Sequence, residues 1–276
     1  MCVCTLIGHA QNNVSISDST IFGNPPDSIP KIFAKGIISI PDRYEYGLSI
    51  SPNYDELFFT AEKPAKGLMV MKKLDDGHWS IPETANLRGD SSWEFEAFYT
   101  PNGQKLYFAS DVKDTSRLWF SIKEKTKWSA PKLLESPVND TPVFWATFTN
   151  NNTMYYTNLA VFKIFRSQII DNQYKKTENV GLPFGIHPYV SKDESFILFN
   201  GKGDIYITFK DRFDKWTEPI KLGKLINTSE YDETCPSLSP DGKFIFFSRY
   251  NDLNQKSDIY WVSSSIIEKT RREIFK

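Results

Sequence analysis

A segment rich in aromatic and apolar residues recurs five times along this chain. Each copy joins two expected strands through a short polar turn, and the last copy, YDETCPSLSPDGKFIFFSR (231–249), is the clearest. The copies align on the hydroxyl residue that opens the turn: Ser51, Thr100, Thr149, Ser191 and Ser239. These residues lie 49, 49, 42 and 48 positions apart. Because one such unit cannot bury its own apolar face, the repeat predicts copies that pack against each other.

Each repeat predicts four strands. Proline, glycine and asparagine in the turns, as in Pro240-Asp241-Gly242, favour a tight hairpin between the first two strands. A third apolar strand follows, and then a turn that closes on an aromatic residue: Trp79, Trp128, Tyr174 and Trp216. Three of these aromatics are followed three residues later by a proline, which suits an outer edge strand. Four antiparallel strands per unit are typical of a β-propeller blade, and the regular aromatic row indicates packing within blades.

The fifth repeat ends after its third strand, and the missing strand is found near the other end of the chain. Pro30-Lys31-Ile32 resembles Pro131-Lys132-Leu133, which opens an outer strand. The sequence therefore predicts an all-β fold, a five-bladed β-propeller of four-stranded antiparallel blades whose ring is closed by the N-terminal strand. Residues 30–276 form this single domain, with a short helix expected over 264–275.

Composition limits the kinds of binding partner that can be expected for this chain. The chain has 276 residues, 33 basic and 34 acidic, so its net charge of -1 gives no reason to expect a nucleic-acid partner. No apolar run is long enough for a transmembrane segment. Cys235 is the one cysteine beyond the first four residues, which excludes an internal disulfide framework. We expect a monomer.

The N-terminus indicates export. Residues 1–10 resemble the end of a truncated signal peptide, although an ordinary loose terminus would look the same. Residues 11–29 are polar and contain Pro25-Pro26, and we expect them to form a flexible linker. This arrangement predicts a periplasmic or secreted protein.

Two features of the repeats carry a family resemblance. Residues 238–247 (LSPDGKFIFF) followed by 257–262 (SDIYWV) resemble the TolB-like, WD-repeat-like β-propeller family. The blade ends GHWSIP, TKWSAP and DKWTEP are similar to those of small secreted members from Bacteroidetes-type bacteria. The resemblance covers about residues 30–270 and implies a periplasmic or secreted propeller that commonly acts as a binding scaffold. It defines fold positions and implies no catalytic residues.

Ligand-contacting residues are expected where the innermost strands begin, at the mouth of the central channel. One aligned column there holds Gly47, Glu96, Trp145, His187 and Cys235. A second column, two residues earlier, holds Glu45, Glu94, Val143, Gly185 and Glu233. Both columns vary between repeats more than the turn and core columns do. We therefore predict ligand-binding positions at seven residues: Glu45, Glu94, Glu96, Trp145, His187, Glu233 and Cys235.

Each candidate has a structural alternative. The three glutamates of the second column bind a cation or a basic peptide, or else they accept bonds from backbone N–H groups. Trp145 stacks on a ligand or packs in an aromatic core. Glu96, His187 and Cys235 lack the tight spacing of zinc ligands, so the sequence predicts no metal and no cofactor. Cys235 shows no partner base that would activate it as a nucleophile.

Three functions are compatible with these residues. The leading prediction is a non-enzymatic, exported scaffold that binds a protein or glycan partner at the channel mouth, because no catalytic constellation is recognisable. The alternative is a carbohydrate-active hydrolase or lyase that uses the mouth carboxylates and His187 as acid and base. A sensor domain of a larger assembly is the third.

Overall fold

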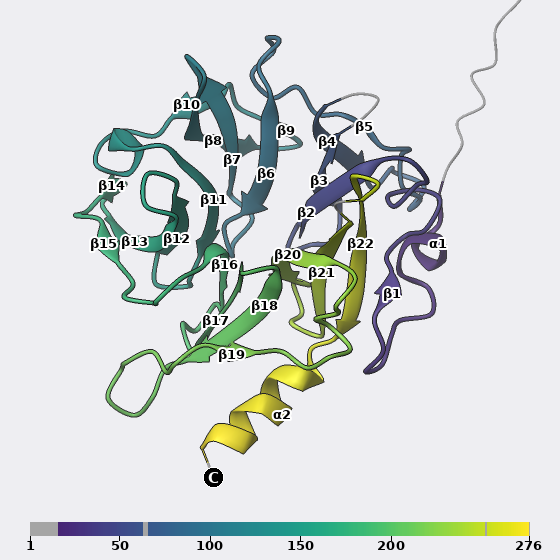
Figure 1. Cartoon of the computed structure of the whole chain (residues 1–276). Helices are drawn as coiled ribbons and strands as arrows, with labels where there is room; N and C mark the ends of the chain where they lie inside the picture. The colour runs from purple at the N-terminus through teal and green to yellow at the C-terminus, as the bar shows by residue number, and fades with distance from the viewer. Residues whose placement is uncertain (1–15, 63–65, 252, 276) are drawn as a thin grey trace, which may run out of the picture.

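Antiparallel strands make up most of the regular structure in residues 16–62, 66–251 and 253–275, which are the residues that the computed structural model describes. Figure 1 shows the sheets spread around the middle of the molecule, where their first strands meet. The predicted signal peptide (1–10) and the first part of the predicted linker (11–15) lie outside the described residues. The structure thus confirms the all-β prediction.

The first four repeats each form an inner, a second, a third and an outer strand, in sequence order from the inside outward, and the second and third repeats each add one further two-residue strand. The first repeat contains β2 (Tyr44–Ile50), β3 (Glu56–Glu62), β4 (Gly67–Lys72) and β5 (Glu83–Thr84). The second contains β6 (Glu94–Tyr99), β7 (Lys105–Val112), β8 (Thr115–Glu124), β9 (Lys127–Trp128) and β10 (Lys132–Leu133). The third contains β11 (Val143–Phe148), β12 (Thr153–Asn158), β13 (Lys163–Ile170), β14 (Gln173–Tyr174) and β15 (Glu178–Asn179). The fourth contains β16 (Ile186–Val190), β17 (Phe196–Gly201), β18 (Asp204–Phe209) and β19 (Ile220–Lys221).

The last repeat contributes three strands, and the start of the chain adds a fourth. These strands are β20 (Asp232–Leu238), β21 (Phe244–Asn251), β22 (Lys256–Ser263) and β1 (Lys31–Ile32). β1 pairs antiparallel with β22, so that Lys31 lies opposite Trp261. The first and last sheets are also joined by one parallel pair, Tyr44 with Ser257, into one eight-stranded sheet. The sequence did not predict this link between sheets. Taken repeat by repeat, the strands nevertheless form five sheets.

The innermost strands pack side by side. β2 contacts β6, β6 contacts β11, β11 contacts β16, β16 contacts β20, and β20 contacts β2. An apolar cluster lies at each of these sheet-to-sheet contacts. Phe58, Leu106 and Phe108 belong to the cluster between the first two sheets, for example. The cluster between the last and first sheets contains Phe59 and Trp261. Burial of these faces is the main favourable term that holds the sheets together.

The turn hydroxyls have the same role in every sheet. The first residue of each second strand donates its backbone N–H to the hydroxyl oxygen that opens the turn. The accepting residues, with N···O distances, are Ser51 (3.1 Å), Thr100 (3.1 Å), Thr149 (3.0 Å), Ser191 (3.0 Å) and Ser239 (3.0 Å). A hydroxyl at this position satisfies a strand-end donor, which explains why every repeat retains Ser or Thr there.

Part of the predicted linker, residues 16–22, packs against the sheets. Ile16 and Trp79 exchange backbone hydrogen bonds of 3.0 and 2.6 Å, and the short helix α1 (Asp18–Phe22) follows. Ile21 of α1 is buried, and the Phe22 ring packs against Phe33 and Trp79. Three apolar side chains at 16, 21 and 22 are enough to anchor this segment, and its polar composition concealed them.

The C-terminal helix is present. α2 (Ser265–Ile274) lies outside the sheets, at the lower edge of Figure 1, with Ile267 buried against the fourth and fifth sheets. Within the described residues, neither helix has the length and apolar character needed to cross a bilayer.

Candidate functional site

Every innermost strand is interrupted by a β-bulge at the same aligned position. The pairing between the first and second strands shifts there in all five sheets. The bulged residues have left-handed backbone φ angles: Gly47 (66°), Glu96 (53°), Trp145 (56°), His187 (51°) and Cys235 (55°). These five are the first of the two columns predicted from the sequence. Glycine adopts this conformation freely, whereas the other four residues do so at a cost of about 1–2 kcal/mol each. We name these five residues the bulge ring.

Side chains of the neighbouring second strand hold three of the bulges in place. The backbone N–H of each bulged residue donates to a polar side chain of the preceding sheet. The pairs are Glu96 with Thr60 (2.8 Å), His187 with Thr157 (2.9 Å) and Cys235 with Asn200 (3.3 Å). The corresponding residue before Trp145 is Ala109, which is fully buried in the same cluster as the indole. This second-strand column was not singled out from the sequence, although its polar residues interrupt otherwise apolar strands.

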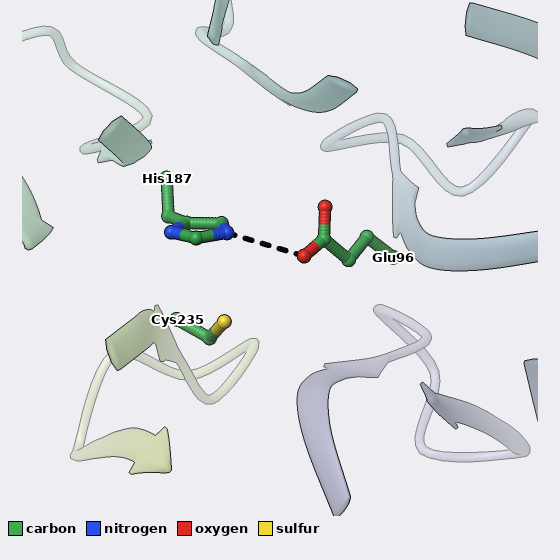
Figure 2. Close-up of side chains that lie close together, drawn as sticks. All are labelled: Glu96, His187 and Cys235. Atoms are coloured by element: carbon green, nitrogen blue, oxygen red, sulfur yellow. Dashed lines mark hydrogen bonds and ion pairs between the residues drawn. The ribbon is translucent and has the colours of Figure 1, made fainter. Parts of the chain in front are cut away.

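Three members of the bulge ring converge. Figure 2 shows His187 and Glu96 pointing toward one another, with Cys235 beside them. His187 Nε2 lies 3.2 Å from Glu96 Oε1, and one potential ligand atom from each of the three residues lies within 4.8 Å of the others. The side chains of Glu96 and His187 are only 4% and 12% exposed, and Cys235 is also buried. Among the described residues, no other group of three or more His, Cys, Asp or Glu side chains brings its potential ligand atoms this close together.

Asn200 fixes the tautomer of His187. The Asn200 Oδ1 atom accepts the backbone N–H of Cys235, so the amide oxygen faces the ring. His187 Nδ1 lies 2.7 Å from that oxygen and must donate a proton to it. The Nε2 atom faces Glu96 and carries either a second ring proton or a free lone pair.

His187 and Glu96 are electrostatically coupled. Burial raises the pKa of Glu96, and the nearby imidazole offsets part of that rise. For His187, burial lowers the pKa, but the Cys235 sulfur and the Glu96 carboxylate outweigh burial and hold the pKa well above its usual range. The two groups therefore titrate as a coupled pair, and both pKa values lie above their usual range.

Aromatic rings surround this group. Trp145 is fully buried, and its ring lies edge-on to the His187 ring at 4.8 Å. Its indole Nε1 donates to the Pro188 carbonyl at 2.9 Å. Phe144 meets the same imidazole edge-on at 4.9 Å. The structure therefore places Trp145 in the aromatic packing around His187.

The glutamates of the second column lie elsewhere. Each is buried and accepts backbone N–H groups from the segment that leads into its own strand. The donors are Ile40 to Glu45 (3.3 Å), Leu87 to Glu94 (2.8 Å) and Thr228 to Glu233 (3.1 Å). Burial raises the pKa of all three, to about 7 for Glu45 and about 6 for Glu233. This arrangement is the backbone-bonding alternative considered for these residues, and it does not bring them into the converging group.

Partly exposed aromatic residues border the same end of the innermost strands. The Tyr44 ring lies 5.1 Å from Tyr46 and 5.2 Å from Tyr250. Tyr46 donates its hydroxyl proton to Glu62 Oε1 at 3.0 Å. Tyr44, Tyr250 and Glu62 remain partly exposed. We name these four residues the tyrosine rim. The sequence carries no signal for these residues, because they stand one to three residues before the aligned column or at the far end of the second strands.

Known proteins resemble this chain only at the level of solved structures. A putative TolB from Agrobacterium tumefaciens is 17% identical, with a TM-score of 0.49, over 76% of this chain and 71% of that protein. TolB from Acinetobacter baumannii gives the same score at 12% identity, and this chain spans about half of it, 54%. A periplasmic gluconolactonase from Pseudomonas aeruginosa scores 0.44 at 12% identity, over 74% of this chain and 65% of that one.

Comparisons of sequence find no counterpart. No protein-family profile matches the chain, and no curated protein matches it.

Proposed function

We propose that this protein is an exported, TolB-like β-propeller that binds a glycan, without catalysis, at the mouth formed by its innermost strands. In this proposal the five sheets are blades of one monomeric ring. The pairing of β1 with β22 and the apolar cluster between the first and last sheets support closure of that ring. A propeller closed in this way has no unprotected sheet edge at its seam.

The observation that carries the proposal is the bulge ring. The same left-handed backbone recurs in five sheets and is strained in the four without glycine, yet the side chains differ completely: none, carboxylate, indole, imidazole and thiol. Glycine would remove the strain at every position, so a purely structural role would favour glycine throughout. Backbone strain that is maintained under different side chains supports a role for those side chains in binding.

The tyrosine rim favours a glycan over a protein partner. Tyrosine rings offer apolar faces to sugar C–H groups, and the Glu62 carboxylate beside Tyr46 offers a hydrogen-bond acceptor to sugar hydroxyls. Glu96 and His187 lie on the innermost strands β6 and β16 with side-chain atoms 3.2 Å apart, and would add a carboxylate and an imidazole to the binding surface.

A glycan array probed with the labelled full-length protein tests this proposal. We expect binding to a restricted set of glycans, and at least a tenfold loss with Glu62→Gln. Glu83→Gln, on the exposed strand β5, is the matched control and should bind like the unsubstituted protein. Equal binding by the two variants would place the site away from the rim. Capture of a protein by the full chain with no glycan bound would favour a protein partner.

The location is part of the same proposal. Export to the periplasm or the medium rests on residues 1–10 and on the resemblance to TolB proteins described from the sequence. Fractionation of cells that express the tagged full-length chain tests it. A pool confined to the cytosol would contradict it.

One observation favours a hydrolase or lyase as the second candidate. The carboxyl group of Glu96 and the imidazole of His187 lie 3.2 Å apart, close enough to exchange a proton as an acid–base pair would. A panel of polysaccharides assayed with the unsubstituted protein and with Glu96→Gln separates the candidates. Turnover that disappears with Glu96→Gln establishes the enzyme, and absence of turnover on every substrate supports the binder.

A further inference from the structure

We propose that Glu96, His187 and Cys235 together bind one divalent transition-metal ion, and that Zn²⁺ suits the three donors best. This inference goes beyond glycan binding and does not depend on it. It reverses the sequence-based prediction of no metal, which relied on ligand spacing along the chain. A site assembled from three different sheets shows no such spacing.

The donor set fits zinc. A thiolate, an imidazole nitrogen and a carboxylate oxygen are the three protein ligand types that Zn²⁺ takes, whereas Mg²⁺ and Ca²⁺ prefer oxygen alone. The ligand atoms lie within 4.8 Å of one another, and the closest pair, His187 Nε2 and Glu96 Oε1, are 3.2 Å apart. Ligand atoms of a tetrahedral zinc site lie about 3.3–3.8 Å apart, given bond lengths of about 2.0–2.3 Å. Side-chain adjustments of about 1 Å would complete the site.

One oxygen of the site has no partner in the described structure. Glu96 Oε2 is buried and accepts no hydrogen bond, while the whole residue is 3% exposed. A buried carboxylate oxygen without a donor destabilises the fold, because it loses its hydrogen bonds to water and forms none within the protein. A cation among Glu96, His187 and Cys235 would compensate that oxygen directly.

The surroundings orient the histidine as metal sites require. Histidine ligands commonly donate their second N–H to an oxygen, which fixes the ring and the tautomer. Here Nδ1 donates to Asn200 Oδ1 at 2.7 Å, and Nε2 faces the other two donors. Trp145 and Phe144 then hold the ring from the side.

The ligands come from β6, β16 and β20, so a bound ion would connect three sheets. Binding requires loss of the Cys235 thiol proton and of any proton on His187 Nε2, and the ion takes their place. Because the unfolded chain holds no such assembled site, metal binding should also stabilise the fold.

Cobalt titration of the metal-free, full-length protein tests the site, because Co²⁺ bound to a thiolate gives a charge-transfer band. The titration is performed with Cys2→Ser/Cys4→Ser in the background, so that Cys235 is the only thiol. We expect one Co²⁺ per chain, the thiolate band, and displacement by Zn²⁺. Cys235→Ser should abolish the band, and His187→Asn should weaken Zn²⁺ binding by about 100-fold or more.

His78→Asn is the matched control, because His78 lies in an exposed turn with Asp76 and is the other described histidine. This variant should bind metal like its parent. Asn200→Ala keeps all three ligands and should weaken binding by about 10–100-fold, as loss of a supporting hydrogen bond does. Thermal melts of each metal-free variant establish that it is folded.

Three results would overturn the proposal: no thiolate band in the folded parent, a band that persists in Cys235→Ser, or equal Zn²⁺ affinity of the His187→Asn and His78→Asn variants. None of these results depends on a glycan, so failure of the metal site is distinguishable from failure of the proposed function.

Discussion

Two sets of five equivalent positions differ in what the repeat keeps constant. At the turns, five hydroxyl residues each accept the N–H of the next strand's first residue, at 3.0–3.1 Å. At the bulge ring, five residues share one backbone conformation but five different side chains. The backbone needs the hydroxyl in the first set and needs no particular side chain in the second. Side-chain variety on a constant backbone therefore marks the positions that are free to serve function.

The largest expected effect concerns Trp145, the bulkiest bulge-ring residue in the apolar core. Trp145→Ala should destabilise the fold by about 3–5 kcal/mol, because a fully buried indole is removed along with its bond to Pro188. Urea unfolding followed by circular dichroism measures the change. Leu253→Ala, at a side chain that is 97% exposed, is the control and should change stability by less than about 0.5 kcal/mol. A loss below about 1 kcal/mol at Trp145 would return the indole to the binding candidates.

The pH dependence of stability tests the buried glutamates. Burial raises the pKa of Glu45 to about 7 despite the Arg43 ion pair at 2.5 Å, whereas the unfolded chain's carboxyl titrates near 4.5. The folded state thus binds this proton more tightly, and its stabilising contribution is lost as pH rises from about 4.5 to about 7. The loss should amount to about 1–3 kcal/mol, since one pKa unit corresponds to about 1.4 kcal/mol.

Urea unfolding of the unsubstituted protein and of Glu45→Gln at the two ends of that range measures this contribution. The variant should show the smaller decline in unfolding free energy. Glu233 has its pKa raised to about 6 in the same way and remains in both proteins, so the difference between them isolates Glu45. Parallel pH profiles would show that Glu45 titrates normally.

Alanine at the turn hydroxyls should have a moderate and similar effect. Ser51→Ala, Ser191→Ala and Ser239→Ala each leave one strand-end N–H without its acceptor, at about 1–2 kcal/mol. Ser51 and Ser191 also accept the N–H of the residue before that strand end, at 3.0 and 2.8 Å, so their variants should lose slightly more than Ser239→Ala. Thermal unfolding should give midpoints that agree closely for Ser51→Ala and Ser191→Ala. Widely different midpoints for these two would show that the turns are not equivalent.

The smallest effect on stability is expected at Glu96. Glu96→Gln keeps the shape and one hydrogen bond to His187, so the free energy of unfolding should change by about 1 kcal/mol or less. The same urea experiment measures it, without added metal. A loss as large as that of Trp145→Ala would make Glu96 a structural residue and would remove the contrast between turns and bulge ring.

The sequence predicts the repeat, the four strands per unit, the outer strand at 30–32 and the aligned column at 47, 96, 145, 187 and 235. All of these follow from short-range patterns: turn residues, strand alternation and equal spacing. Convergence of Glu96, His187 and Cys235 could not be predicted, because it depends on how sheets far apart in the sequence face one another. The packing of Ile16, Ile21 and Phe22 against the sheets was not predicted either, because three apolar residues in a polar segment leave no periodic signal.

X-ray diffraction at the zinc absorption edge, from crystals grown with Zn²⁺, decides whether the bulge ring is the functional part of an otherwise uniform scaffold. We expect one strong anomalous peak within bonding distance of Glu96, His187 and Cys235. A map with no peak there, or with side chains of the three residues pointing apart, would contradict this expectation.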